Sequence, residues 1–306
     1  MKNNTLRIAT RNSPLAMWQA EYVQQQLNHH YPELRIELVP VVTKGDRLLD
    51  VSLAKIGGKG LFIKELEHAL LDDRADIAVH SMKDVPQAFP EGLLLGVICQ
   101  REDPRDAFVS VKYPDFRSLP QGAIVGTSSL RRQCQLLAMR PDLQIKMLRG
   151  NVNTRLKKLT DGEFDATILA AAGLMRLAMH DHINHCFEVE NMLPAAGQGA
   201  LGIELRAEDE IYDLIQILRH EETTIALTAE RAVNAKLGGS CQVPIGAYAQ
   251  INKGQIHLTA LIADPDTNHI FSANHSADCQ DAQSLGVAVA EELIAQGARE
   301  IVARLI

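Results

Sequence analysis

Five arginines stand where short apolar runs give way to sequences typical of helix starts: Arg11 before Ser13-Pro14, Arg131 and Arg132 after Thr127-Ser128-Ser129, and Arg149 and Arg155 around Asn151. A helix N-terminus already carries partial positive charge, so a cation there costs roughly a few tenths of a kcal/mol unless an anion binds nearby. For any single arginine, a solvated surface position is the better interpretation. As a set they favour a ligand with several carboxylates, which the planar guanidinium suits. We expect Arg176, after Ala171-Ala172-Gly173, to join them.

A single carboxylate lies among these cations in the segment His80-Ser81-Met82-Lys83-Asp84-Val85-Pro86. One interpretation makes Asp84 a turn residue that caps local N–H groups before Pro86. In the other, the surrounding positive charge keeps Asp84 ionised, so that it stabilises a developing cation and relays protons at a nitrogen. Both interpretations stay open, and the second suits substitution chemistry through a cation.

Glycines and lysines recur between Thr43 and Phe62, in a segment that contains Lys55-Ile56-Gly57-Gly58-Lys59-Gly60. The segment is long enough for a mobile lid, to which Lys55 and Lys59 would add positive charge on closing. A plain surface loop is an equally good interpretation.

Cys241 differs from the other cysteines in its setting. Gly238-Gly239 removes side chains before it and Pro244 stiffens the chain after it, which favours a loop that presents a thiol for covalent attachment. A free cysteine is more often buried and inert, so spacing alone leaves both roles open. The five cysteines are scattered without a CxxC spacing, which predicts free thiols and argues against a disulfide framework or a metal site: Cys99, Cys134, Cys186, Cys241 and Cys279.

The elements that would position these residues alternate between strand and helix over the first two hundred residues. We expect strands near 5–10, 34–42, 75–80, 123–127, 144–148 and 165–170, and helices at 14–29, 60–72, 129–139, 151–161 and 173–179. The pattern breaks around Pro104, Pro114 and Pro120 and then starts again, which predicts two related α/β lobes. The carboxyl ends of strands in open α/β sheets face one crevice, so we expect the junction residues of both lobes to meet in a cleft.

The chain beyond Glu221 has another character. A helix rich in Ala and Leu leads to the loop with Cys241, then to a hairpin-like run from Ile256 to His275 and a final helix at about 281–297. This order predicts a small α+β domain.

Bulk composition narrows the class of protein. The 306 residues, 46% apolar and 23% charged, suffice for two or three compact domains. A formal net charge of −7 argues against general attraction to nucleic acid, which depends on surplus Lys and Arg. The N-terminal residues contain no apolar stretch typical of a signal peptide or a membrane span, so we expect a cytoplasmic protein without a membrane partner.

Taken together, these segments resemble the hydroxymethylbilane synthases, also called porphobilinogen deaminases, and the match runs essentially from end to end. The matching segments are 8–16 (IATRNSPLA), 57–65, 80–86 (HSMKDVP), 125–132 (VGTSSLRR), 148–155 (LRGNVNTR), 194–200 (PAAGQGA) and 241–246 (CQVPIG). One departure is Ser240, where many relatives have glycine; the thiol at 241 is kept.

The resemblance implies two lobes like those of anion-binding periplasmic proteins and a small α+β C-terminal domain. The first lobe would comprise 1–99 and 200–217, the second 100–199, and the third domain 218–306. The resemblance also implies a dipyrromethane cofactor, made from two substrate units and joined to Cys241 by a thioether. Such an enzyme removes ammonia from each porphobilinogen and adds the resulting cation to the growing chain. Four additions and hydrolysis then give hydroxymethylbilane.

The acetate and propionate groups of each pyrrole are the carboxylates that the arginine pattern indicated. By resemblance, Asp84 would stabilise pyrrole nitrogens and cations and assist proton transfer. The cofactor would be held by Cys241, Ser81, Lys83, Asp84, Thr127, Ser129, Arg131 and Arg132, and the substrate and growing chain by Arg11, Ser13, Phe62, Arg149, Arg155 and Arg176. Porphobilinogen and the growing pyrrole chain are then the partners of an expected monomer.

Two other classes of protein stay open at this point. Paired lobes with helix N-termini at a cleft suit a non-catalytic anion-binding protein equally well, although the lack of an export signal and the glycine loop before Cys241 argue against it. A nucleic-acid-binding regulator fits the net charge less well. In the enzyme interpretation, charge reversal at Arg131 or Arg132 is expected to impair cofactor assembly more than folding, because the cations repel one another until ligand carboxylates arrive.

Overall fold

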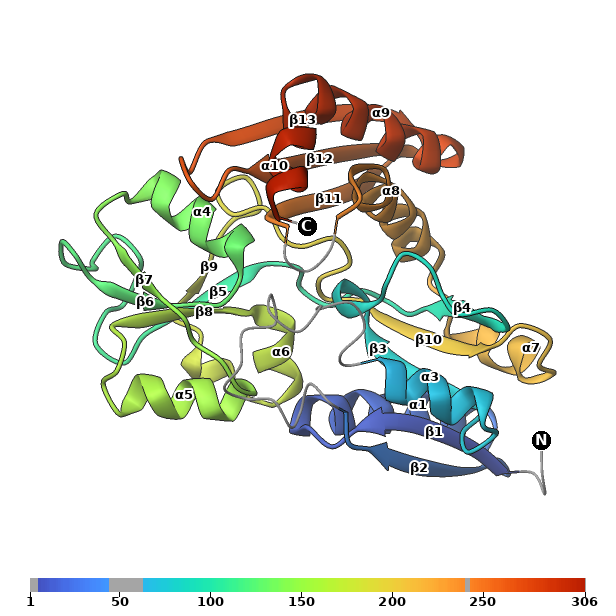
Figure 1. Ribbon diagram of the computed structural model, residues 1–306. Helices are drawn as coiled ribbons and strands as arrows, with labels where there is room; N and C mark the ends of the chain where they lie inside the picture. Colours follow the sequence, from blue (N-terminus) through green and yellow to red (C-terminus); the bar gives the residue numbers. More distant parts are fainter. Residues whose placement is uncertain (1–4, 44–62, 240–242, 306) are drawn as a thin grey trace. The chain divides into compact units, whose positions relative to one another are not determined.

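A computed structural model describes residues 5–43, 63–239 and 243–305 of the chain. The chain divides into two compact units. Figure 1 labels the helices and strands of both units. Unit 1 comprises Met1–Glu102 and Ala200–Thr224, and unit 2 comprises Asp103–Gly199 and Ile225–Ile306. Each unit therefore combines segments that are far apart in the sequence.

The described part of unit 1 is built on strands β1 (Thr5–Arg11), β2 (Arg35–Val41), β3 (Ile77–Ser81), β4 (Leu93–Ile98) and β10 (Leu201–Arg206). They form one sheet in the order β2-β1-β3-β10-β4, in which β1 is parallel to β2 and β3, and β10 is antiparallel to β3 and β4. The helices are α1 (Pro14–His30), α3 (Lys64–Leu71) and α7 (Ile211–Ile215). Residues Val23 and Leu27 of α1 pack with Leu6 and Ile8 on one face of the sheet. On the other face, α3 packs against Ala9 and Ala78.

Unit 2 contains a second five-stranded sheet, made of β5 (Asp106–Val109), β6 (Ile124–Gly126), β7 (Gln144–Lys146), β8 (Ala166–Ala170) and β9 (His185–Cys186). Its order is β7-β6-β8-β5-β9, with β6 parallel to β7 and β8, and β5 antiparallel to β8 and β9. Helices α4 (Leu130–Met139), α5 (Val152–Thr160) and α6 (Ala171–Arg176) follow β6, β7 and β8. Apolar clusters around Phe108 and around Leu148 surround this sheet.

The two sheets share one topology. In each, the first of three parallel strands lies between the second and the third, and a strand from another part of the chain, β10 or β5, runs antiparallel beside the third. The expectation of two related α/β lobes is therefore confirmed.

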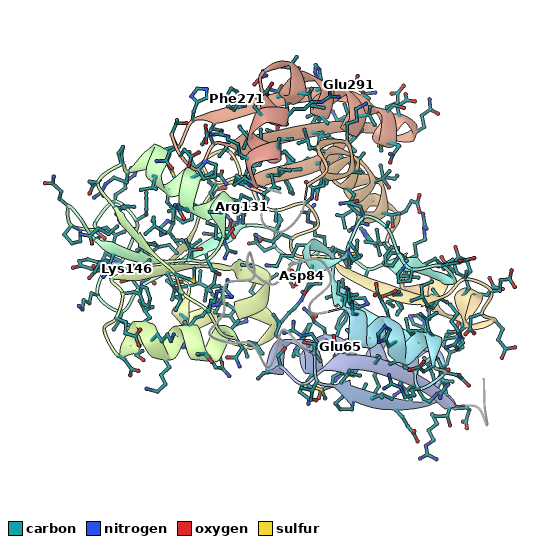
Figure 2. The ribbon with its side chains drawn as sticks, viewed as in Figure 1. Glu65, Asp84, Arg131, Lys146, Phe271 and Glu291 are labelled. Carbon is teal, nitrogen blue, oxygen red and sulfur yellow. The ribbon has the colours of Figure 1, made fainter. Side chains whose placement is uncertain are left out.

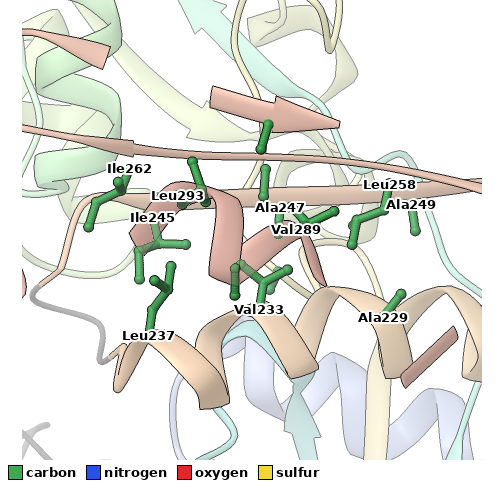
Figure 3. Packing of buried hydrophobic residues seen from close by; sticks show 14 of the residues in the cluster. Ala229, Val233, Leu237, Ile245, Ala247, Ala249, Leu258, Ile262, Val289 and Leu293 are labelled. Carbon is green, nitrogen blue, oxygen red and sulfur yellow. The ribbon is translucent and has the colours of Figure 1, made fainter. Parts of the chain in front are cut away.

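The C-terminal part of unit 2 is an α+β domain, as expected. Strands β11 (Ile245–Asn252), β12 (Gln255–Ala263) and β13 (Ile270–Asp278) form an antiparallel sheet, and helices α8 (Glu221–Leu237), α9 (Ala282–Ala295) and α10 (Ala298–Leu305) complete the domain. The core between sheet and helices is aliphatic (Figure 3) and includes Val233, Leu237, Ile245, Ala247, Leu258, Ile262, Val289 and Leu293.

Every strand and helix expected over the first two hundred residues is present, with ends that differ by a few residues. Strands β4, β5, β9, β10 and β11 were not expected from the sequence. Strands β5 and β10 are buried on both faces, so they lack the polar and apolar alternation that marks a half-exposed strand. The division into three domains at the stated boundaries stays a prediction.

None of the described helices combines the length and the apolar character needed to cross a membrane.

Candidate active site

In unit 1, the candidate residues gather at one edge of the sheet. Because β1 and β3 are parallel neighbours, Arg11 at the end of β1 and Ser81 at the end of β3 lie at the same edge. Ser13 caps α1 by accepting a hydrogen bond from the Ala16 amide (3.3 Å). Gln19 of α1 donates through Nε2 to the Ser81 hydroxyl (2.8 Å), so this helix and β3 are joined where both carry candidate residues.

Asp84 ends a short 3₁₀ turn, Met82–Asp84, directly after β3 (Figure 2). Backbone groups close this turn: the Met82 amide donates to the Ala200 carbonyl oxygen (3.0 Å), and the Val85 amide donates to the Met82 carbonyl oxygen (3.2 Å). Met82 is buried and Lys83 half-buried, whereas Asp84 is exposed. The Asp84 carboxylate is therefore presented at the surface of unit 1 by a turn that is anchored to β3 and to the start of β10.

A buried ionisable cluster lies just before this turn, and sequence reasoning did not find it. His80 of β3 contacts Glu204 of β10, with 2.8 Å between Nε2 and Oε2, and both side chains are almost completely buried. Burial, and then repulsion from Glu204, raises the pKa of Glu67 on α3. His80 and Glu204 are 124 positions apart in the sequence, so no local pattern could indicate the pair.

In unit 2, three strand-to-helix junctions share one edge of the sheet, because β6, β7 and β8 are parallel. Ser129 caps α4 by accepting from the Arg132 amide (3.4 Å), and the Thr127 hydroxyl accepts from the Ser129 amide (3.2 Å). At the next junction Asn151 caps α5 by accepting from the Thr154 amide (2.9 Å). These caps are the helix starts that the sequence predicted.

The arginines of this edge differ in their surroundings. Arg149 and Arg155 are half-buried, and Arg155 Nε donates to the Gly150 carbonyl oxygen (2.9 Å). Gly150 has φ +111°, a conformation that favours glycine. Arg176 lies in the last turn of α6 and is 9% exposed; its Nη2 donates to the Gly199 carbonyl oxygen (2.6 Å). The structure thus gives Arg176 a backbone partner in the segment that matched the family at 194–200.

The expectation that Arg131 and Arg132 are uncompensated cations is wrong. Both are buried and form ion pairs with the fully buried Asp106 of β5, each with an N···O distance of 2.7 Å. Burial acts to raise the pKa of Asp106, but the charges of Arg131 and Arg132 outweigh it and hold that pKa well below its ordinary value. Charge reversal at either arginine would put buried carboxylates side by side, so the expectation that it impairs assembly more than folding is also corrected.

Two further polar side chains hold the glycine loop Gly197-Gln198-Gly199 in place, one from the loop itself and one from α8. Gln198 donates through Nε2 to Asp106 Oδ1 (3.0 Å) and to the Pro104 carbonyl oxygen (2.7 Å). Glu230 of α8 accepts from the Gly197 amide (2.7 Å) and from the Ala249 amide (2.9 Å). The match at 194–200 could have drawn attention to Gln198, whereas no local signal marks Asp106 or Glu230.

Four predicted site residues, Lys55, Lys59, Phe62 and Cys241, lie outside the described residues, as does Ser240. The chain on either side of 240–242 is described: Gly239 donates its amide to the Asn234 carbonyl oxygen (2.8 Å), and Val243 is buried. Among the other cysteines, burial raises the pKa of the Cys134 thiol to about 11 and also raises that of Cys186. Within the described ranges, no group of His, Cys, Asp or Glu has the arrangement of a metal site.

Solved structures of binding proteins are similar to part of the chain. The methionine binding protein MetQ is 14% identical in sequence and has a TM-score of 0.46; the match covers 69% of this chain and 88% of the MetQ chain. A nutrient binding protein from Burkholderia cenocepacia bound to methionine is 13% identical, with coverages of 69% and 89% and a TM-score of 0.44. The periplasmic aliphatic sulphonate binding protein SsuA from Escherichia coli is 17% identical, with coverages of 76% and 70% and a TM-score of 0.40.

Two family models match the chain itself. Residues 6–213 match the porphobilinogen deaminase dipyromethane cofactor binding domain, and residues 224–295 match the porphobilinogen deaminase C-terminal domain. The first match includes the candidate residues of both sheet edges. The chain therefore belongs to the porphobilinogen deaminase family, the transferases with a dipyrromethane cofactor that act as hydroxymethylbilane synthases in tetrapyrrole synthesis.

Proposed function

We propose that this chain joins four porphobilinogen molecules into linear hydroxymethylbilane on a dipyrromethane primer attached to Cys241. The observation that best supports this proposal is the edge of the unit 2 sheet. Neighbouring strand ends and the helices after them supply several donors there. These donors are the hydroxyl groups of Thr127 and Ser129 and the guanidinium groups of Arg149, Arg155, Arg131 and Arg132. The Arg131–Arg132 pair carries one more charge than its counterion, Asp106. This donor set fits a group that carries acetate and propionate side chains.

When bound, dipyrromethane supplies a pyrrole ring whose free carbon accepts the next unit. We assign Thr127, Ser129, Arg131, Arg132, Ser81, Lys83 and Asp84 to the cofactor. We assign Arg11, Ser13, Phe62, Arg149, Arg155 and Arg176 to porphobilinogen and the growing chain, and Lys55 and Lys59 to a closing lid. For the described residues, these assignments rest on the family's motifs together with the shared sheet edges described above. For Phe62, Lys55 and Lys59 they rest on the sequence alone.

In each addition, the C–N bond of the aminomethyl group of porphobilinogen breaks and ammonia leaves. A C–C bond then forms to the free carbon of the last ring, which gives up its proton. The Asp84 carboxylate is suited to accept hydrogen bonds from pyrrole N–H groups, to lower the energy of the cation and to assist the proton transfer. Its exposed position on an anchored turn supports this role.

Intact mass of the purified protein tests the cofactor assignment. We expect wild type to carry an adduct of two pyrrole units, and Cys241→Ser to be folded, unmodified and nearly inactive, because an alcohol captures a carbocation less well than a thiolate. Cys279→Ser is the matched control, since Cys279 is a free cysteine of the same C-terminal domain, and it should keep the adduct. An adduct retained by Cys241→Ser, or lost in Cys279→Ser, would show that the attachment residue is wrong.

Location in the cell, oligomeric state and partners complete the proposed function. We assign the protein to the cytoplasm as a monomer whose partners are porphobilinogen and the growing chain, without a nucleic-acid or membrane partner. The net charge of −7 supports the absence of a nucleic-acid partner. Salt-dependent binding to duplex DNA at micromolar protein concentration would contradict that part.

A further inference from the structure

Three side chains of unit 2 meet at the carboxylate of Asp106. The residue lies at the start of β5 and is completely buried. Its Oδ1 accepts from Arg132 Nε (3.0 Å), Arg132 Nη2 (2.7 Å) and Gln198 Nε2 (3.0 Å). Its Oδ2 lies 2.7 Å from Arg131 Nη2. One carboxylate therefore binds the first turn of α4 and the glycine loop at 197–199 together.

Each arginine also has a second anchor on the backbone. Arg131 Nη1 donates to the Leu193 carbonyl oxygen (2.5 Å), and Arg132 Nη1 donates to the Ile168 carbonyl oxygen (2.9 Å). A planar guanidinium bound at two points has little freedom to rotate. Two buried guanidinium groups this close would repel each other strongly without the shared anion. With Asp106 between them, the group keeps one unit of net positive charge in a defined orientation.

We propose that Asp106 is a positioning residue of the deaminase: its carboxylate holds Arg131 and Arg132 in the one arrangement in which they receive ligand carboxylates, and Gln198 holds Asp106 in turn. The inference rests on the proposed assignment of Arg131 and Arg132 to the cofactor. A preorganised pair contributes to turnover because no reorientation is needed when charge develops nearby. The polycarboxylate itself would contact the arginines and not Asp106.

The test uses two variants in the full chain, each with a matched control. Asp106→Asn removes the charge at constant shape, and Asp142→Asn is its control, because Asp142 forms an ion pair of the same 2.7 Å length with Arg140 in the same lobe but away from Asp106. Gln198→Met keeps both ion pairs and removes the side-chain amide, whose Nε2 donates to Asp106 and to the Pro104 carbonyl oxygen. Gln24→Met is its control, since Gln24 of α1 in unit 1 is a half-buried glutamine whose Nε2 also donates to a backbone carbonyl oxygen, that of Ile36 (3.0 Å).

Three readouts are taken for each protein: Tm, the fraction with the covalent adduct by intact mass, and kcat and KM for porphobilinogen per loaded molecule. We expect kcat to fall about 10- to 100-fold in loaded Asp106→Asn and by a smaller factor in loaded Gln198→Met, with KM changed little, because positioning and not affinity is lost. Both controls should keep wild-type kcat. A role in stability alone would lower Tm and yield while leaving the kcat of loaded molecules unchanged.

Wild-type kcat in loaded Asp106→Asn would overturn the inference. If that variant does not fold, Gln198→Met decides: reduced kcat beside an unaffected Gln24→Met supports the positioning role, and unchanged kcat overturns it. A wild-type protein that carries no adduct and releases no ammonia from porphobilinogen would instead contradict the proposed function, independently of how the variants behave.

Discussion

Two aspartates of this chain show how surroundings assign different roles to one residue type. Asp84 is exposed on an anchored turn after β3, where a carboxylate can meet a ligand. Asp106 is completely buried between two arginines, which hold its pKa well below the ordinary value, so it stays ionised and unavailable to solvent. The same contrast applies to thiols: burial raises the pKa of Cys134 to about 11, and such a thiol is a poor nucleophile at neutral pH.

Asp84→Asn separates a catalytic carboxylate from a turn residue. If the charge stabilises the cation, the amide should lower ammonia release about 100- to 1,000-fold, while Asp84→Glu, which keeps the charge but displaces it, should fall between the amide and wild type. The measurement is single-turnover ammonia release from porphobilinogen by proteins whose loading is established by mass. Near-normal release by loaded Asp84→Asn, with at most about 1 kcal/mol of lost stability, would identify Asp84 as a turn residue.

At the scale of elements, helix α8 links the glycine loop to the residues before Cys241. Glu230 in its middle binds the Gly197 amide, and its C-terminal end leads through Gly238, at φ +69°, to residue 240. Helix α9 packs closely against α8 at Gly286, where an added Cβ would collide with the Ala229 carbonyl oxygen and lie 2.5 Å from Ala232 Cβ. The placement of α8, the helix before Cys241, thus depends on a helix contact that only glycine permits.

Gly286→Ala is expected to destabilise the protein by about 1–3 kcal/mol, because the backbone atoms that the new methyl group meets cannot move without separating α8 from α9. Ser284→Ala, at an exposed position of the same helix, is the control and should change the free energy of unfolding by less than about 0.5 kcal/mol. Urea denaturation of both variants and wild type measures the effect. A Gly286→Ala protein as stable as the control would show that the helices separate at little cost.

At the scale of the whole molecule, each compact unit contains a buried carboxylate that is ionised in the native state. In unit 1, Asp76 is held by Arg7, with 2.6 Å between Nη2 and Oδ1; burial acts to raise the pKa of Asp76, but the hydrogen bonds from Arg7 lower it below the ordinary value. In unit 2 the charges of Arg131 and Arg132 lower the pKa of Asp106 in the same way.

Membership of a transferase family removes the alternative of a non-catalytic binding protein, although the two-lobed fold alone suits an enzyme and a binding protein equally well.

The free energy of unfolding should fall as the pH drops below about 4. In this range the unfolded chain takes up protons at its aspartates, whereas native Asp76 and Asp106 do not, so protons favour the unfolded state. Asp106→Asn should be less stable than wild type by about 3–5 kcal/mol at pH 7, because buried arginines lose their partner. This deficit should narrow below about pH 4. Urea denaturation from pH 7 to pH 3 measures both curves, and a deficit that stays constant down to pH 3 would contradict the assignment.

Helix starts could be predicted from the sequence because the hydrogen bonds that form them join residues close together in the chain. Ser13, Ser129 and Asn151 each cap a helix by bonding an amide three residues later, so their roles are visible in a few consecutive residues. The strand and helix alternation predicted the lobes for the same reason, and the family's motifs identified the chemistry. The placement of Arg11 near Ser81 also followed, since parallel neighbouring strands end at one edge.

The compensation of charge depends on contacts between residues that are far apart in the sequence. Asp106 lies 26 positions from Arg132 and 92 from Gln198, and Glu204 lies 124 positions from His80. No periodicity links residues so far apart, and an aspartate that follows Arg105 in the sequence gives no sign that it will be buried between two other arginines. Local sequence patterns were enough to show which cations stand at the helix starts. The fold buries the carboxylate of Asp106 between Arg131 and Arg132. These two cations therefore form one positioned group instead of a pair of mutually repelling charges, which no local sequence pattern could show.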